Sequence, residues 1–181
     1  MAAIPNIHEK VLVNSLVFEA VGKASRTIDS FSNWLLAGFA AAITFLLGNL
    51  ESLSGQISSS GVQYCAYLFI AALILGILEK ILATVIAAAS AGAAIGREIG
   101  TQNAERDIEL QPDVFFSEME RTVLRPMRWF VRRSFAKAKS GDLTAAARSF
   151  AATVQVQGLL VTLQVVVVLR AVYVLAQELA F

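Results

Sequence analysis

Apolar residues gather in three long blocks along the chain, and shorter polar stretches separate the blocks. They run from Phe31 to Leu50, from Val62 to Gly96 and from Ala151 to Phe181. Each is long enough for a bilayer core, which needs roughly 20 apolar helical residues. Strands of a membrane barrel would alternate apolar and polar positions, and runs such as Val165 to Val168 do not. The pattern predicts an all-α integral membrane bundle with three transmembrane helices.

The segment before the first block has apolar residues three and four positions apart. This spacing predicts a cytoplasmic amphipathic helix in residues 1–32, which lies on the membrane surface or packs on another helix. The first transmembrane helix then occupies residues 33–50, with Ser32 as its N-cap and Trp34 at the level of the headgroups. Residues 51–61 are rich in serine and glycine and contain no lysine or arginine, so we expect a short outer turn.

The second apolar block is longer than a bilayer requires, because a helix over Val62 to Gly96 would measure about 52 Å. Two interpretations are open. Residues 62–110 form one long transmembrane helix that extends into the cytoplasm, or the block is a hairpin of two short spans that turns near Glu79 and Lys80. We favour the single helix, since no glycine, proline or asparagine occurs at that turn.

Residues 111–141 follow as a basic amphipathic segment in the cytoplasm, and Pro126 should kink it. Aromatic residues are interleaved among the basic residues there, which favours a helix lying on anionic lipid of the inner leaflet. Packing against the N-terminal helix is the alternative. Nucleic acid is not expected as a partner, because no nucleic-acid motif surrounds these residues. The residues expected at the lipid surface are Arg121, Arg125, Arg128, Trp129, Arg132, Arg133, Lys137 and Lys139.

The distribution of lysine and arginine predicts the orientation. Residues 142–181 form a helix that ends as the third transmembrane helix, and the tail after Tyr173 contains neither cation. The region 97–148, in contrast, contains ten. Basic flanks stay on the cytoplasmic side, so the N-terminus should be inside and the C-terminus outside, in a bacterial inner membrane.

Composition argues against several classes of function. The net charge of +1 gives no electrostatic reason for a nucleic-acid or acidic partner. Cys65 is the only cysteine and His8 the only histidine, so neither an intrachain disulfide nor a metal cluster is expected. The sequence contains no P-loop, dinucleotide fingerprint, nucleophile elbow or HExxH motif. We therefore expect no cofactor and no catalytic residue.

A row of small residues at intervals of four follows the second helix, interrupted by Lys80. Such rows let helix backbones approach closely, and close contact drives helix association in lipid. Packing within one bundle and a homo-oligomeric interface explain the row equally well. Its members are Ala72, Gly76, Thr84, Ala88, Gly92, Gly96 and Gly100.

Polar residues within the apolar helices are the second set of candidates, since such residues are costly in lipid. Glu79 and Lys80 lie near the inner end of the second span, where both can snorkel to the headgroups. Gln157 and Gln164 share one face of the third helix. They would form hydrogen bonds between helices, or line a water-filled path.

Arg170 lies within the third span and shares a helical face with Tyr173 and Gln177. It can snorkel toward the outer headgroups, line a pore or contact another subunit. The estimated depths of Arg170 and Glu79 differ too much for a salt bridge within one chain.

Three functions follow from these patterns. The preferred one is a non-enzymatic membrane protein that self-associates, or scaffolds a membrane complex, through the second helix. The second is an oligomeric pore or channel. The third is a membrane lipid enzyme, because an amphipathic helix before three spans is similar to the layout of small bacterial diacylglycerol kinases. Their acidic catalytic motifs are not recognisable in this sequence, so no active-site residue is carried over.

Overall fold

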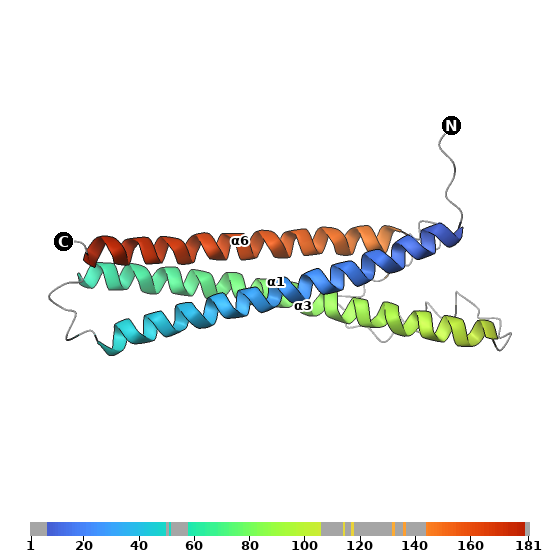
Figure 1. Cartoon of the computed structure of the whole chain (residues 1–181), viewed down its shortest axis with the longest axis horizontal. Coiled ribbons are helices and arrows are strands. Elements are labelled where there is room, and N and C mark those ends of the chain that lie inside the picture. The colour runs from blue at the N-terminus through green and yellow to red at the C-terminus, as the bar shows by residue number, and fades with distance from the viewer. Residues whose placement is uncertain are drawn as a thin grey trace, which may run out of the picture. The chain divides into compact units, whose positions relative to one another are not determined.

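Three long helices make up most of the described part of the chain. The computed structural model describes residues 7–49, 51, 58–105, 114, 117, 132, 136 and 144–179. Within them, α1 spans Ile7–Gly48, α3 spans Ser59–Glu105 and α6 spans Ala145–Leu179 (Figure 1). No strand occurs in these ranges, so the described part of the chain is entirely helical.

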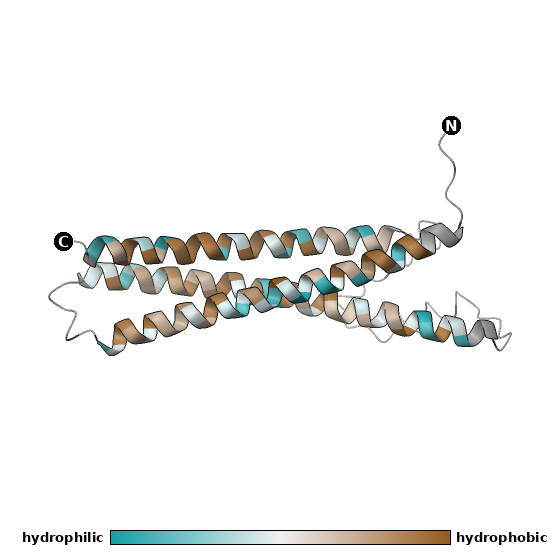
Figure 2. Ribbon diagram, viewed as in Figure 1, coloured by the Kyte–Doolittle hydropathy of each residue, from teal (hydrophilic) through white to brown (hydrophobic). Residues whose placement is uncertain are grey.

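All three helices are long and apolar enough to cross a membrane. The candidate spans are Leu12–Gly48, Ser59–Gln102 and Ala145–Glu178. In the most apolar 18-residue stretch of each helix, only 11% to 22% of the residues are buried inside the structure. Figure 2 shows apolar residues along all three helices, and many of their large side chains, such as Leu159, Val166 and Leu169, are more than half exposed. An apolar outer surface is what lipid requires, whereas a soluble bundle turns its apolar stripe inward.

α1 is continuous through the point where we expected two separate elements. Ser32 lies in the middle of this helix, and its hydroxyl donates a hydrogen bond to Gln164 Oε1 at 2.8 Å. The prediction that Ser32 caps the first span is therefore wrong. Between Gly22 and Gly38 the sequence contains no glycine or proline, so nothing interrupts the helix there.

α3 is also continuous, and it passes through Glu79 and Lys80 without a turn. The hairpin alternative is therefore wrong. Ser58 caps the helix, because its hydroxyl oxygen accepts a hydrogen bond from the backbone N–H of Gly61 at 3.0 Å. Residues 59–61, expected in the outer turn, thus belong to α3, while residues 52–57 of that turn lie outside the described ranges.

The described helices divide into two compact units, each with its own contacts. Unit 1 comprises residues 1–22 and 86–152, and unit 2 comprises residues 23–85 and 153–181. In unit 1 the rings of Phe18 and Phe150 lie 5.1 Å apart between centroids. A Cβ on Gly22 would lie 3.3 Å from Ser90 Cβ, so α1 approaches α3 closely at this point.

Unit 2 has a small apolar core between its three helices. The core consists of Phe39, Ile43, Cys65, Ala72 and Ala171. Phe39 packs edge-on against the ring of Phe69 on α3, with 5.3 Å between centroids.

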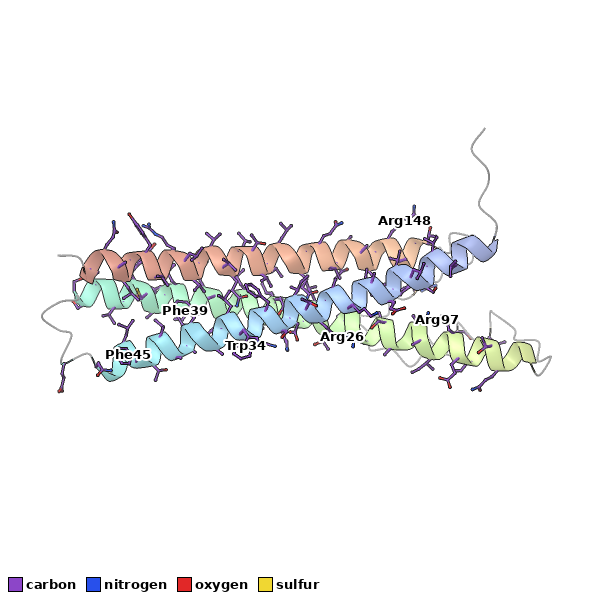
Figure 3. All side chains as sticks on the ribbon, in the orientation of Figure 1. Arg26, Trp34, Phe39, Phe45, Arg97 and Arg148 are labelled. Atoms are coloured by element: carbon purple, nitrogen blue, oxygen red, sulfur yellow. The ribbon has the colours of Figure 1, made fainter. Side chains whose placement is uncertain are left out.

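The face of α1 that carries Phe39 is buried, and other aromatic residues of α1 point outward. Phe39 is 4% exposed, whereas Trp34 is 78% and Phe45 is 67% exposed. Figure 3 labels all three on α1. Large aromatic side chains on the outer surface of a span are compatible with lipid.

Candidate functional site

Five polar side chains are buried between the helices of unit 2. They are Ser25, Ser32, Glu79, Gln157 and Gln164, each 3% exposed or less. Within each helix the residues that take part are seven positions apart, and seven residues are two turns, or about 10 Å. The buried polar groups therefore form two layers across the same three helices.

The first layer, which we call the Gln164 layer, consists of Ser32, Gln164 and the backbone of Ala72. The Ser32 hydroxyl donates to Gln164 Oε1 at 2.8 Å, and Gln164 Nε2 donates to the Ala72 carbonyl oxygen at 3.4 Å. Gln164 thus joins α6 to both α1 and α3. Both polar atoms of its side chain have a partner.

Gly76 makes room for this layer. A Cβ at position 76 would lie 2.5 Å from Leu36 Cδ1 and 3.2 Å from Gln164 Nε2. Both distances are shorter than ordinary van der Waals contact, so a side chain here would push Leu36 and Gln164 aside. The absence of a side chain at Gly76 lets α3 approach α1 and α6.

The second layer, the Glu79 layer, consists of Glu79, Gln157 and the backbone of Ser25. Gln157 Nε2 donates to Glu79 Oε1 at 2.5 Å and to the Ser25 carbonyl oxygen at 3.2 Å. Glu79 Oε2 and Gln157 Oε1 are buried without a hydrogen-bond partner. This layer joins the same helices as the first but leaves two acceptors unsatisfied.

An ion pair lies beside the Glu79 layer. Lys80 Nζ contacts the two carboxylate oxygens of Asp29 at 2.7 and 2.9 Å. The Lys80 side chain is 54% exposed and that of Asp29 is 24% exposed. The sequence suggested that both Glu79 and Lys80 snorkel to the headgroups. Lys80 lies at the surface, but Glu79 is buried, so this interpretation is wrong for Glu79. Adjacent residues of a helix point about 100° apart, which is how one is buried and the next is not.

The row of small residues along α3 has two different environments. Ala72 and Gly76 are buried in unit 2, whereas Thr84 and the members beyond it are exposed. A Cβ built at Gly92, Gly96 or Gly100 would meet no described side chain within 4 Å. The exposed members are Thr84, Ala88, Gly92, Gly96 and Gly100.

Arg170, Tyr173 and Gln177 form an exposed polar strip on α6. The Arg170 guanidinium lies 5.4 Å from the centroid of the Tyr173 ring, and Gln177 Nε2 donates to the Tyr173 hydroxyl at 2.9 Å. These contacts lie within one helix, and no ion pair between Arg170 and Glu79 occurs among the described residues. The strip is therefore a surface feature of unit 2.

Sequence reasoning missed several partners. Ser25 and Asp29 contribute to the two polar contacts around Glu79, and Glu178 Oε2 accepts a hydrogen bond from the Ser58 backbone N–H at 3.0 Å. The spacing of Ser25, Asp29 and Ser32 on one face of α1 is a signal that could have found them. The sequence does not show which helices this face of α1 contacts.

Most of the predicted lipid-binding residues lie outside the described ranges. Arg132 is described, in a helical position with an exposed side chain. Outside the description are Arg121, Arg125, Arg128, Trp129, Arg133, Lys137 and Lys139.

No group of three or more histidine, cysteine, aspartate or glutamate residues that could hold a metal occurs among the described residues. No family model matches the chain, and no curated protein or solved structure is significantly similar to it. Fold and site together define a class: an all-helical protein with three helices long and apolar enough to span a membrane. Within that class, this chain is characterised by two polar layers between the spans.

Proposed function

We propose that this chain is a non-enzymatic integral membrane protein that self-associates, or scaffolds a membrane complex, through the open small-residue face of α3. We define this face by Ala88, Gly92, Gly96 and Gly100. The observation that carries the proposal is the space beside the three glycines, where an added Cβ would meet no described side chain. A helix surface without side chains lets a second helix approach its backbone.

The geometry of unit 1 supports this choice of face. Ser90 of α3 faces α1, because a Cβ on Gly22 would lie 3.3 Å from it. Gly92 follows two residues later and points about 200° away around the helix, so it faces away from that contact. Ile95 and Ile99 flank the glycines and are 57% and 43% exposed, which adds apolar area beside the glycines that a partner helix would contact.

The proposal includes a placement in the membrane. The N-terminus and the segment 111–141 lie in the cytoplasm, and the C-terminus lies outside a bacterial inner membrane, as the distribution of basic residues predicts. In this orientation the basic segment rests on anionic lipid of the inner leaflet.

Cysteine crosslinking in native membranes tests the interface. Cys65 is buried, so the wild-type chain should form no disulfide between copies. Gly96→Cys should give covalent dimers under mild oxidation, because the proposal brings two α3 helices together at this position. Ala94→Cys is the matched control, since Ala94 is exposed about 200° away around the same helix. Equal crosslinking at both positions, or none at either, would contradict the proposed interface.

A pore formed by several copies is the second candidate, and the exposed strip of Arg170, Tyr173 and Gln177 favours it. An arginine on the outer surface of a span is costly in lipid unless it reaches the headgroups or lies in a polar lining. If the strip lines a pore, reconstituted liposomes should pass ions under a voltage, and Arg170→Ala should change the ion selectivity. Liposomes that remain tight would exclude this candidate.

A further inference from the structure

We propose that the Glu79 layer is a proton-binding site, with Oε2 of Glu79 as the atom that takes the proton. The inference does not depend on self-association, because all groups of the layer belong to one chain. It assigns a ligand to the polar cluster that the proposed function leaves without a role.

The burial of Glu79 is the first observation. Its side chain is 1% exposed, in the interior of three apolar helices. An ionised carboxylate in such a place is strongly destabilised unless a cation or several donors compensate the charge. The side-chain donors close to Glu79 are neutral: the amide of Gln157, which donates to Oε1, and the hydroxyl of Ser32, which also donates to Gln164. Neutral N–H and O–H groups do not compensate a full charge.

The charged groups in and around the Glu79 layer include one more carboxylate than cations. On α1 the charged group that faces Glu79 is Asp29, on α3 it is Lys80, and α6 contributes the uncharged Gln157. Lys80 already contacts both oxygens of Asp29. Two carboxylates and one ammonium carry a net charge of −1, and one proton on Glu79 makes the group neutral. The other cations of this part of α1, Lys23 and Arg26, are exposed.

The hydrogen-bond inventory of the layer also lacks a donor. The amide of Gln157 has two N–H groups, which go to Glu79 Oε1 and to the Ser25 carbonyl. Glu79 Oε2 and Gln157 Oε1 remain without a donor. A proton that binds Oε2 forms one O–H bond and changes the group from a charged acceptor into a neutral donor. The protonated layer therefore contains a donor that the ionised layer does not have.

A metal ion fits the layer less well than a proton. Hard cations such as Ca²⁺ take six to eight oxygen ligands, and the layer offers two free oxygen atoms. A proton needs one. The Gln164 layer serves as an internal reference, since it has the same helices and spacing but no titratable side chain, and both polar atoms of its amide are bonded.

Infrared spectroscopy of the full chain tests the site directly. The protein is reconstituted in vesicles of phosphatidylethanolamine and phosphatidylglycerol, and spectra are compared for the wild type, Glu79→Gln and Glu178→Gln. The wild type should show the carbonyl stretching band of a protonated carboxyl at neutral pH. The band should be absent in Glu79→Gln and present in Glu178→Gln, because Glu178 is a carboxyl of the same unit outside both layers. A wild-type spectrum without the band, or a band that persists in Glu79→Gln, would overturn the proposal.

A stability titration provides an independent readout. If the folded chain holds a proton on Glu79 that the unfolded chain releases, the unfolded state binds fewer protons, and the stability falls as the pH rises. The midpoint of thermal unfolding should therefore fall with rising pH in the wild type, and the fall should be smaller in Glu79→Gln. Equal pH dependence in the two proteins, or a midpoint that depends on sodium rather than on pH, would count against proton binding.

Discussion

The two parts of the small-residue row on α3 have the same spacing and different surroundings. At Gly76 an added Cβ would collide with Leu36 and approach the amide of Gln164, whereas at Gly92 it would meet no described side chain. The first part is used for packing within the chain, next to the buried polar layers. No described side chain contacts the glycines of the second part. The spacing of small residues therefore indicates where helices can approach closely, but not whether the partner belongs to the same chain.

Leucine substitution at the two glycines should separate these roles most clearly. Gly76→Leu inserts a side chain where there is no space and displaces Gln164 from its layer, so we expect a loss of about 3 kcal/mol. Gly92→Leu, the matched change in the open part, should not lower the stability of the single chain. Denaturant unfolding in detergent at low protein concentration measures both. Equal losses would mean that the two parts of the row are not different.

Removal of Gln157 should have the next largest effect. Gln157→Leu leaves Glu79 and the Ser25 carbonyl without their shared donor, and buried polar groups without partners cost about 2 kcal/mol. The double variant Glu79→Leu/Gln157→Leu should recover much of that loss, since replacing both partners by apolar groups leaves fewer unsatisfied atoms. A double variant less stable than Gln157→Leu would contradict this account of the Glu79 layer.

Ser32→Ala should have the smallest effect of the three. The change removes one hydrogen bond of the Gln164 layer and leaves Gln164 Oε1 without its donor, so we expect a loss of about 1 kcal/mol. Ser30→Ala, at an exposed position of the same helix, is the control and should cost little. Equal losses at the two serines would show that the hydroxyl of Ser32 contributes nothing specific.

The sequence predicted the three long helices because a bilayer imposes a minimum apolar length, which is visible without knowledge of the tertiary structure. It also placed Gln157 and Gln164 on one helical face, since this follows from the helical period alone. It did not predict the continuity of α1, because polar residues around Ser32 resemble a helix start when the partner that satisfies them is unknown. The hydrogen bond from Ser32 to Gln164 joins residues that are 132 positions apart.

The different environments of Glu79 and Lys80 could not be predicted for the same reason. A charged pair at adjacent positions has the same sequence pattern whether it lies at the surface or between helices. The outcome depends on which side of α3 faces α1 and α6, and that is determined by Gly76 and the core around Ala72. Local patterns identified the candidates, while the contacts between helices decided which of them are buried.

The mass of the intact particle in nanodiscs tests the central claim most directly, namely that copies associate through the open face of α3. The wild-type chain should give a particle of more than one subunit, and so should Ala94→Leu. Gly92→Leu/Gly96→Leu should give a particle with fewer subunits and an unchanged helix content. A wild-type particle that contains a single chain of 19.4 kDa, or a double variant with the wild-type mass, would contradict the account.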